Sequence, residues 1–173
     1  MALNLAKNIH RHFCSAIILT VAGIGTLSLP LPSLAAQSGI VFTATLDKTE
    51  YTADEPVNLT FVLKNKDKSP AYVNKRFYFG SEEAPKNQKE VYVMITSPSG
   101  KKLSFKSPYE TGYPKIDYFT LLESGQEVQS EYPRNLRGNF EFNEEGVYAV
   151  TAVYQNTFGR ELGLDVFGGK LAA

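Results

Sequence analysis

Cysteine and histidine are almost absent from this sequence of 173 residues. The one cysteine, Cys14, and the two histidines, His10 and His12, all lie close to its start. Serine-histidine-aspartate and cysteine-histidine catalytic sets, and the usual zinc sites, depend on imidazole or thiol side chains. The chain beyond residue 14 therefore cannot build any of these sites.

Carboxylates are the remaining route to hydrolytic catalysis, since aspartate and glutamate are plentiful. Nothing in the sequence places two of them in one cleft, so we predict that the protein is not an enzyme and needs no cofactor. Asp47, Glu50, Asp54 and Glu55 do cluster in one connection. Their spacing matches no calcium loop, and we interpret them as a solvated turn without a metal ion.

The first 35 residues show the order of features that is typical of a secretory signal peptide. A short basic stretch contains Lys7 and Arg11, and an uncharged apolar run follows over residues 16–29. Small residues then occupy much of positions 33–35, where a signal peptidase would cut. This pattern predicts a chain that is exported.

We expect residues 1–35 to form a helical leader that is cleaved after Ala35 or Ala36, and residues 36–173 to form one domain. A retained membrane anchor is the alternative, because residues 13–29 come close to the minimum apolar length for spanning. The membrane would then be a partner only through this uncleaved leader.

Loss of the leader would leave 16 basic and 18 acidic residues, a net charge near −2. This balance gives no basic face for nucleic acid, so we expect no nucleic-acid partner. An exported domain without a cysteine pair must be held together by its apolar core. Bacterial export fits such a domain better than eukaryotic secretion, and we predict a secreted or periplasmic location.

Beyond the leader, the hydrophobic pattern has a period of two residues, which indicates β-strands. The clearest example is residues 57–64, where Val57, Leu59, Phe61 and Leu63 share one face. The same criteria predict further strands at residues 42–46, 71–79, 91–96, 102–105, 118–122, 127–132, 147–154 and 162–171.

Turn sequences separate these strands. Residues 97–100 (Ser-Pro-Ser-Gly), 123–126 (Glu-Ser-Gly-Gln) and 143–146 (Asn-Glu-Glu-Gly) each have the composition of a tight turn. Residues 147–154 are apolar on both faces, which predicts a central position in a sheet. Because no segment has helical periodicity, we predict an all-β, immunoglobulin-like sandwich of two antiparallel sheets with about seven strands.

Gly146-Val147-Tyr148 resembles the entry to the sixth strand of immunoglobulin-like domains, where a tyrosine hydroxyl bonds to upstream backbone. With Glu55-Pro56-Val57 and the Ser99-Gly100 hairpin, it resembles the pattern of macroglobulin-type domains and of the bacterial intracellular proteinase inhibitor family. The resemblance implies the fold, since fold alone does not transfer an activity. The strand region with Phe77-Tyr78-Phe79-Gly80 departs from the inhibitor family, and a signal peptide conflicts with an intracellular role.

One long segment between residues 105 and 119 is rich in aromatic residues, and we select Tyr109, Tyr113, Tyr118 and Phe119 as candidate binding residues. Tyrosines on a loop bind sugar rings or protein surfaces well, because each offers apolar area, a hydroxyl and few rotatable bonds. The alternative is that these rings are buried and close one end of the sandwich.

We therefore expect a non-enzymatic, exported interaction or structural module. Its partner would be another protein or a surface glycan, and the sequence does not determine its oligomeric state. Two alternatives have candidate segments. A proteinase inhibitor would use an exposed loop over residues 80–89, and a carbohydrate-binding module would use the tyrosine-rich loop.

Overall fold

The computed structural model describes residues 16–21, 39–85, 89–106, 112 and 114–173, and in this part of the chain the protein is all-β. The strands, in chain order, are β1 (Ala16–Val21), β2 (Ile40–Leu46), β3 (Glu50–Thr52), β4 (Asn58–Asn65), β5 (Ala71–Asn74), β6 (Phe79–Gly80), β7 (Val91–Thr96), β8 (Phe119–Leu122), β9 (Glu127–Gln129), β10 (Arg134–Asn135), β11 (Gly146–Asn156) and β12 (Gly169–Ala172). Short 3₁₀ turns are η2 (Ile116–Tyr118), η3 (Leu136–Gly138) and η4 (Arg160–Leu162). None of the described helices is long and apolar enough to cross a bilayer.

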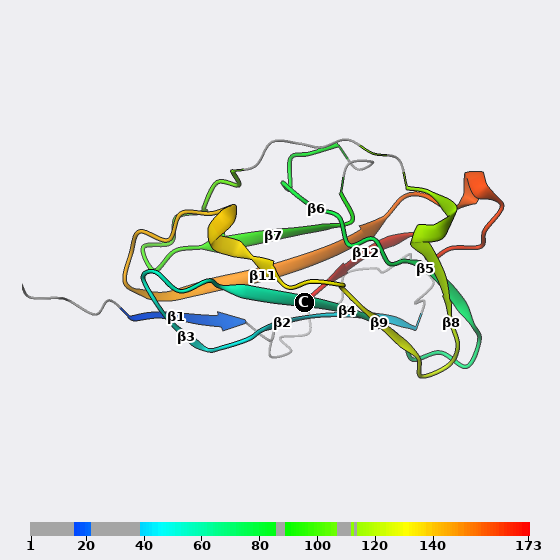
Figure 1. Cartoon of the computed structure of the whole chain (residues 1–173), viewed down its shortest axis with the longest axis horizontal. Helices are drawn as coiled ribbons and strands as arrows, with labels where there is room; N and C mark the ends of the chain where they lie inside the picture. Colours follow the sequence, from blue (N-terminus) through cyan, green and yellow to red (C-terminus); the bar gives the residue numbers. More distant parts are fainter. Residues whose placement is uncertain (1–15, 22–38, 86–88, 107–111, 113) are drawn as a thin grey trace, which may run out of the picture.

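Three sheets organise these strands (Figure 1). Sheet A has the order β3-β1-β11-β7-β6, and β12 also pairs with β11. Sheet B has the order β10-β4-β2, and β9 also pairs with β4, while β5 and β8 form a small third sheet. The central place of β11 confirms the expectation from its two apolar faces.

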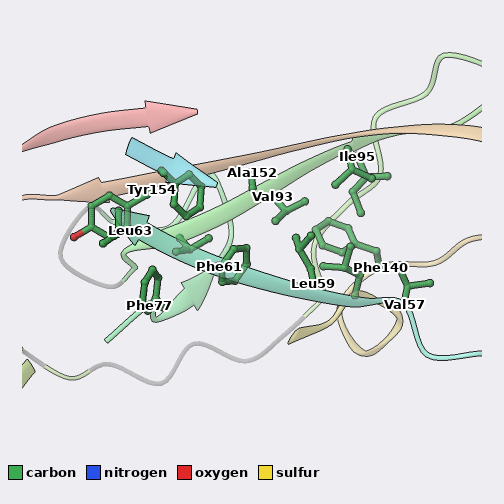
Figure 2. Close-up of a cluster of buried hydrophobic side chains, with 14 of the residues drawn as sticks. Val57, Leu59, Phe61, Leu63, Phe77, Val93, Ile95, Phe140, Ala152 and Tyr154 are labelled. Carbon is green, nitrogen blue, oxygen red and sulfur yellow. The ribbon is translucent and has the colours of Figure 1, made fainter. Parts of the chain in front are cut away.

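The alternation expected around residues 57–64 is confirmed in β4. Val57, Leu59, Phe61 and Leu63 are completely buried, whereas the residues between them are partly exposed. Figure 2 shows these side chains directed from β4 toward residues of β7 and β11. Burial of four such side chains contributes about 1.5–3 kcal/mol each to folding.

Aromatic rings connect sheet B to sheet A. The ring of Phe42 on β2 lies 5.8 Å from that of Tyr154 on β11 and 5.9 Å from that of Phe61 on β4. Phe61 in turn contacts Phe79 of β6, with ring centroids 6.2 Å apart. The inner faces of both sheets therefore contribute to one apolar interior.

The tyrosine at the start of β11 makes the backbone contact that its sequence context predicts. The Tyr148 hydroxyl donates to the carbonyl oxygen of Glu144 at 2.8 Å and accepts from the Glu144 N–H at 2.9 Å. Gly146, between them, has a φ of 130°, which disfavours a residue with a side chain. Tyr148 is fully buried, and its two hydrogen bonds connect the turn at Glu144 to the start of β11.

Residues 71–79 do not form the single predicted strand. The chain leaves β5 after Asn74 and enters β6 only at Phe79. Asn74 is the local cause, because its Oδ1 accepts a hydrogen bond from the Arg76 N–H and turns the chain. Phe77 then adopts a φ of 46°, and its ring is buried in the interior.

Several other predicted elements are shorter than expected. Residues 102–105 contribute only a bridge between Lys102 and Thr96, and β9 ends at Gln129. The closing strand is confined to β12, since η4 occupies the beginning of the predicted 162–171 segment. The described strands are therefore more numerous than the predicted seven and several are shorter than predicted, and β5 and β8 form a third sheet beside sheets A and B.

The predicted leader helix is wrong for the part of it that the structure describes. Residues 16–21 form β1, which pairs in parallel with β11 and antiparallel with β3. Isoleucine, threonine and valine are abundant in this segment, and such β-branched residues favour strands. Parallel pairing also occurs between β6 and β7, so the sheets are antiparallel in most but not all of their pairs.

Replacing Tyr148 by phenylalanine tests the corner contact. Tyr148→Phe removes both hydrogen bonds to Glu144 and keeps the ring, so we expect a loss of about 1–3 kcal/mol in the free energy of unfolding. Chemical denaturation measures the change. The control Tyr132→Phe, at a residue 66% exposed, should change stability by less than about 0.5 kcal/mol; equal effects of the two variants would contradict the role of Tyr148.

Candidate functional site

The four residues selected from the sequence have different positions. Tyr109 and Tyr113 lie outside the described residues. Phe119, on β8, is 8% exposed and belongs to the interior, so it presents little surface to a partner. Tyr118, in η2, is half-buried and borders an open groove.

This groove has a volume of about 400 Å³ and is the strongest candidate site in the described part of the chain. We call it the Arg134 groove. Its lining residues are Lys75, Arg76, Tyr118, Gln129, Ser130, Glu131, Tyr132 and Arg134.

Backbone pairing brings three distant segments to the Arg134 groove. The Lys75 N–H donates to the Tyr118 carbonyl at 2.7 Å, which joins the end of β5 to η2. The Ser130 N–H donates to the Phe61 carbonyl at 2.8 Å, and Arg134 of β10 pairs with Leu59 of β4. The core strand β4 therefore holds one wall, and the small third sheet holds the other.

Arg76 is fixed in its wall by a buried ion pair. Its Nε donates to Oε2 of Glu90 at 2.8 Å and its Nη2 donates to Oε1 at 2.5 Å. Glu90 is 2% exposed and also accepts from the Tyr78 N–H at 2.9 Å and from Asn74 Nδ2 at 3.2 Å. A buried carboxylate with this set of donors is well satisfied, and two-pronged pairing gives arginine a defined orientation.

Two tyrosine rings also contact Arg76. Its guanidinium carbon lies 5.1 Å from the ring centre of Tyr78 and 5.6 Å from that of Tyr118. The Nη1 group donates to the Gly112 carbonyl at 2.6 Å. Arg76 is thus engaged on every side by the protein, and its role is to shape the groove and to hold Tyr118.

Arg134 differs from Arg76 because no ion pair holds it within the described part of the chain. Among the residues that the structure describes, Arg134 makes no salt bridge, and its Nε is buried without a hydrogen-bond partner. A buried donor without an acceptor costs about 1–3 kcal/mol. An acceptor that reaches this guanidinium would be bound favourably.

The outer rim of the groove is polar and aromatic. Lys75 and Glu131 are exposed, and Tyr132 has the most exposed large ring of those measured, at 66%. A hydrogen bond to Glu131 raises the pKa of the Tyr132 hydroxyl above its usual value. The rim therefore offers an uncharged hydroxyl, an ammonium group and an accessible ring face.

The loop proposed for protease inhibition is anchored at its base. The Lys89 ammonium, 3% exposed, donates to the carbonyl oxygens of Ser81, at 2.6 Å, and of Glu82. Burial lowers the pKa of this ammonium, and the charge of Lys170 acts in the same direction. Residues 86–88 of this loop lie outside the described part, and a shallow pocket of about 200 Å³ borders Ser81, Glu82 and Glu83.

The chemistry available at the Arg134 groove is recognition by charge, hydrogen bonds and ring contact. In the described ranges, no three or more acidic, histidine or cysteine residues come together as a metal site. A scan against protein-family models finds no match, and a search of curated proteins finds no relative. A proposal of function therefore rests on the residues of this chain.

Sequence reasoning found only Tyr118 among the residues that line the groove. Arg76 and Arg134 lie 58 positions apart in the sequence, and neither belongs to a recognisable motif. Arg76 follows β5 in the small third sheet and Arg134 lies in β10 of sheet B, so only the folded chain brings them together. Tyr132, at the end of a predicted strand, carried no signal that separated it from the buried tyrosines.

Replacement of Arg76 tests whether its ion pair is structural. Arg76→Met leaves the buried Glu90 carboxylate without its cation, and we expect a loss of about 3–5 kcal/mol in the free energy of unfolding. Adding Glu90→Gln removes the unpaired negative charge and keeps an oxygen acceptor for the Tyr78 N–H. The double variant should therefore recover part of the lost stability. Denaturant titrations compare the two, and a double variant no more stable than Arg76→Met would contradict this role.

Proposed function

We propose that this chain is an exported, non-enzymatic interaction module that binds a carboxylate-bearing glycan in the Arg134 groove. Residues 1–35 would be removed during export to the periplasm or the exterior, and residues 36–173 would form an immunoglobulin-like sandwich. The mostly antiparallel sheets A and B, their shared interior and the Tyr148 contact support this fold.

The observation that carries the proposal is Arg134 Nε, which is buried in the groove without a hydrogen-bond partner among the described residues. Arginine binds a carboxylate through two parallel hydrogen bonds, and such charge-assisted bonds are about twice as strong as neutral ones. Lys75 adds a second cation at the rim, and Glu131 is the acidic residue in the lining. The groove therefore has a small excess of positive charge on a protein whose predicted processed form is slightly acidic.

The tyrosines favour a sugar as the carrier of that carboxylate. Tyr132 presents a mostly exposed ring beside Arg134, and Tyr118 borders the same groove. A tyrosine ring gives flat apolar area and a hydroxyl at low conformational cost, which suits the mixed apolar and polar surface of a sugar ring. Uronic acids combine such a ring with a carboxylate.

A binding assay with an oligouronate tests the groove. Calorimetry with a galacturonate oligosaccharide should show binding, and Arg134→Met should weaken it about tenfold or more, because a hydrogen bond to a charged group contributes about 1.5–3 kcal/mol. Stability should change little, since Arg134 makes no salt bridge among the described residues.

Matched controls define the outcome of this assay. Arg160→Met removes an exposed arginine of η4, outside the groove, and should leave affinity unchanged. A neutral oligosaccharide of the same length should bind far more weakly. Binding of a glutamate-rich peptide in preference to the oligouronate would redirect the proposal to a protein partner, and indifference to Arg134→Met would remove the groove from it.

Export is tested separately. Expression of the full chain in a bacterial host should yield an extracytoplasmic protein that begins at Ala36 or Gln37, as measured by intact mass and N-terminal sequencing. Changing Ala35 and Ala36 together to arginine should block processing, because the cleavage site requires small residues. Recovery of the full-length chain in the membrane fraction would favour the retained anchor instead.

A further inference from the structure

One edge of β11 is shared between two strands that come from opposite ends of the sequence. On one side, β11 pairs with β7 from Ala149 to Tyr154. On the other side, β12 pairs with positions 153–156, while β1 pairs with positions 146–150. Within the described residues, the first half of this edge therefore depends on β1 alone.

β1 lies between two strands rather than at the rim of the sheet. It pairs in parallel with Gly146–Val150 of β11 and antiparallel with Glu50–Thr52 of β3. Since neighbouring strands are separated by about 4.8 Å, β11 and β3 stand about 10 Å apart, with room for one strand between them. We call this space the strand slot, and β1 is visible in it at one end of sheet A (Figure 1).

β3 is held in place by contacts that do not involve β1. The Arg137 guanidinium donates to the carbonyl of Thr52 at 3.0 Å and to that of Glu55 at 2.6 Å. The Tyr51 hydroxyl donates to Asp47 Oδ1 at 2.6 Å and accepts from the Lys48 N–H at 3.0 Å. These bonds keep β3 from moving across to pair with β11.

The predicted leader contains all of β1, so the strand slot would be empty in the processed protein. This step depends on the export proposed above. Loss of β1 leaves one side of Gly146–Val150 and of Glu50–Thr52 without backbone partners. The two strands that border the slot carry the apolar residues Tyr51, Tyr148 and Val150, which are buried, and Val147, which is 52% exposed.

We propose that the processed domain accepts an extended, apolar strand of a partner polypeptide in the strand slot, parallel to β11. Strand addition supplies main-chain hydrogen bonds, and the alternating side chains of the incoming segment supply selectivity. Here both edges of the incoming strand would be paired, which gives it more hydrogen bonds than an ordinary sheet edge offers. The apolar residues that border the slot favour a partner segment similar in composition to residues 16–21.

A labelled peptide with the sequence of residues 16–21 (Ala-Ile-Ile-Leu-Thr-Val), flanked by lysines for solubility, is the probe. Fluorescence anisotropy should show binding to the processed protein that is about tenfold or more tighter than binding to the unprocessed full chain, whose own β1 fills the slot. A control peptide with proline at the positions of Ile18 and Thr20 loses ladder hydrogen bonds and should bind about tenfold more weakly.

Hydrogen exchange measured by mass spectrometry locates the contact. The peptide should slow exchange in residues 146–150 and 50–52 of the processed protein and leave β2 and β4 unchanged. Equal affinity for the processed and unprocessed chains, or protection elsewhere with none at these two segments, would overturn the proposal.

Further variants separate this proposal from the glycan groove and from the removal of the leader. Arg134→Met should bind the peptide as the unaltered protein does. If the leader is not removed, the full chain with Ile17→Pro and Leu19→Pro provides the test, because these changes prevent β1 from pairing and should open the strand slot. Failure of that variant to bind the peptide, while its far-ultraviolet spectrum remains that of a folded β protein, would also overturn the proposal.

Discussion

The aromatic contact between sheets A and B determines much of the rest of the molecule. Tyr154 of β11 contacts Phe42 across the interior, and its hydroxyl donates to the Asn74 carbonyl at 3.0 Å. Burial raises the pKa of this hydroxyl far above neutrality, so it remains a donor. The core thereby fixes the end of β5, from which Arg76 enters the wall of the groove. Packing and site geometry are coupled through this one residue.

A buried polar network begins at Asn74, and in it the charge of Glu90 is paired with that of Arg76. Asn74 accepts from the Arg76 N–H and donates to Glu90, and Glu90 holds both Arg76 and the backbone of Tyr78. A network of this kind specifies one arrangement of the chain, because each member loses its partners if the segment shifts. It also explains why the chain departs from strand geometry after β5. Arg134 differs from these residues, because within the described ranges its Nε has no acceptor.

The two proposed recognition surfaces depend on different kinds of interaction. The Arg134 groove relies on charge and ring contact, so its interactions should weaken with added salt. The strand slot relies on backbone hydrogen bonds and apolar burial, which salt affects much less. The two surfaces share few structural supports, since β10 and the third sheet border one, whereas β3 and β11 border the other. The two proposals therefore do not compete for the same residues.

The sequence alone determined the all-β class, the buried face of β4 and the central place of β11, because these follow from local periodicity. It also determined the turns near Ser99 and Gly125 and the Tyr148 contact, because these follow from turn chemistry. Only the tertiary structure decided that residues 71–79 break at Asn74 and that residues 16–21 pair as a strand, since both depend on partners distant in the chain. It likewise brought Arg76, Tyr118 and Arg134 to one groove. Local pattern specifies which residues are buried, but the meeting of distant segments is set by packing and by the pairing of backbone groups, which no local pattern contains.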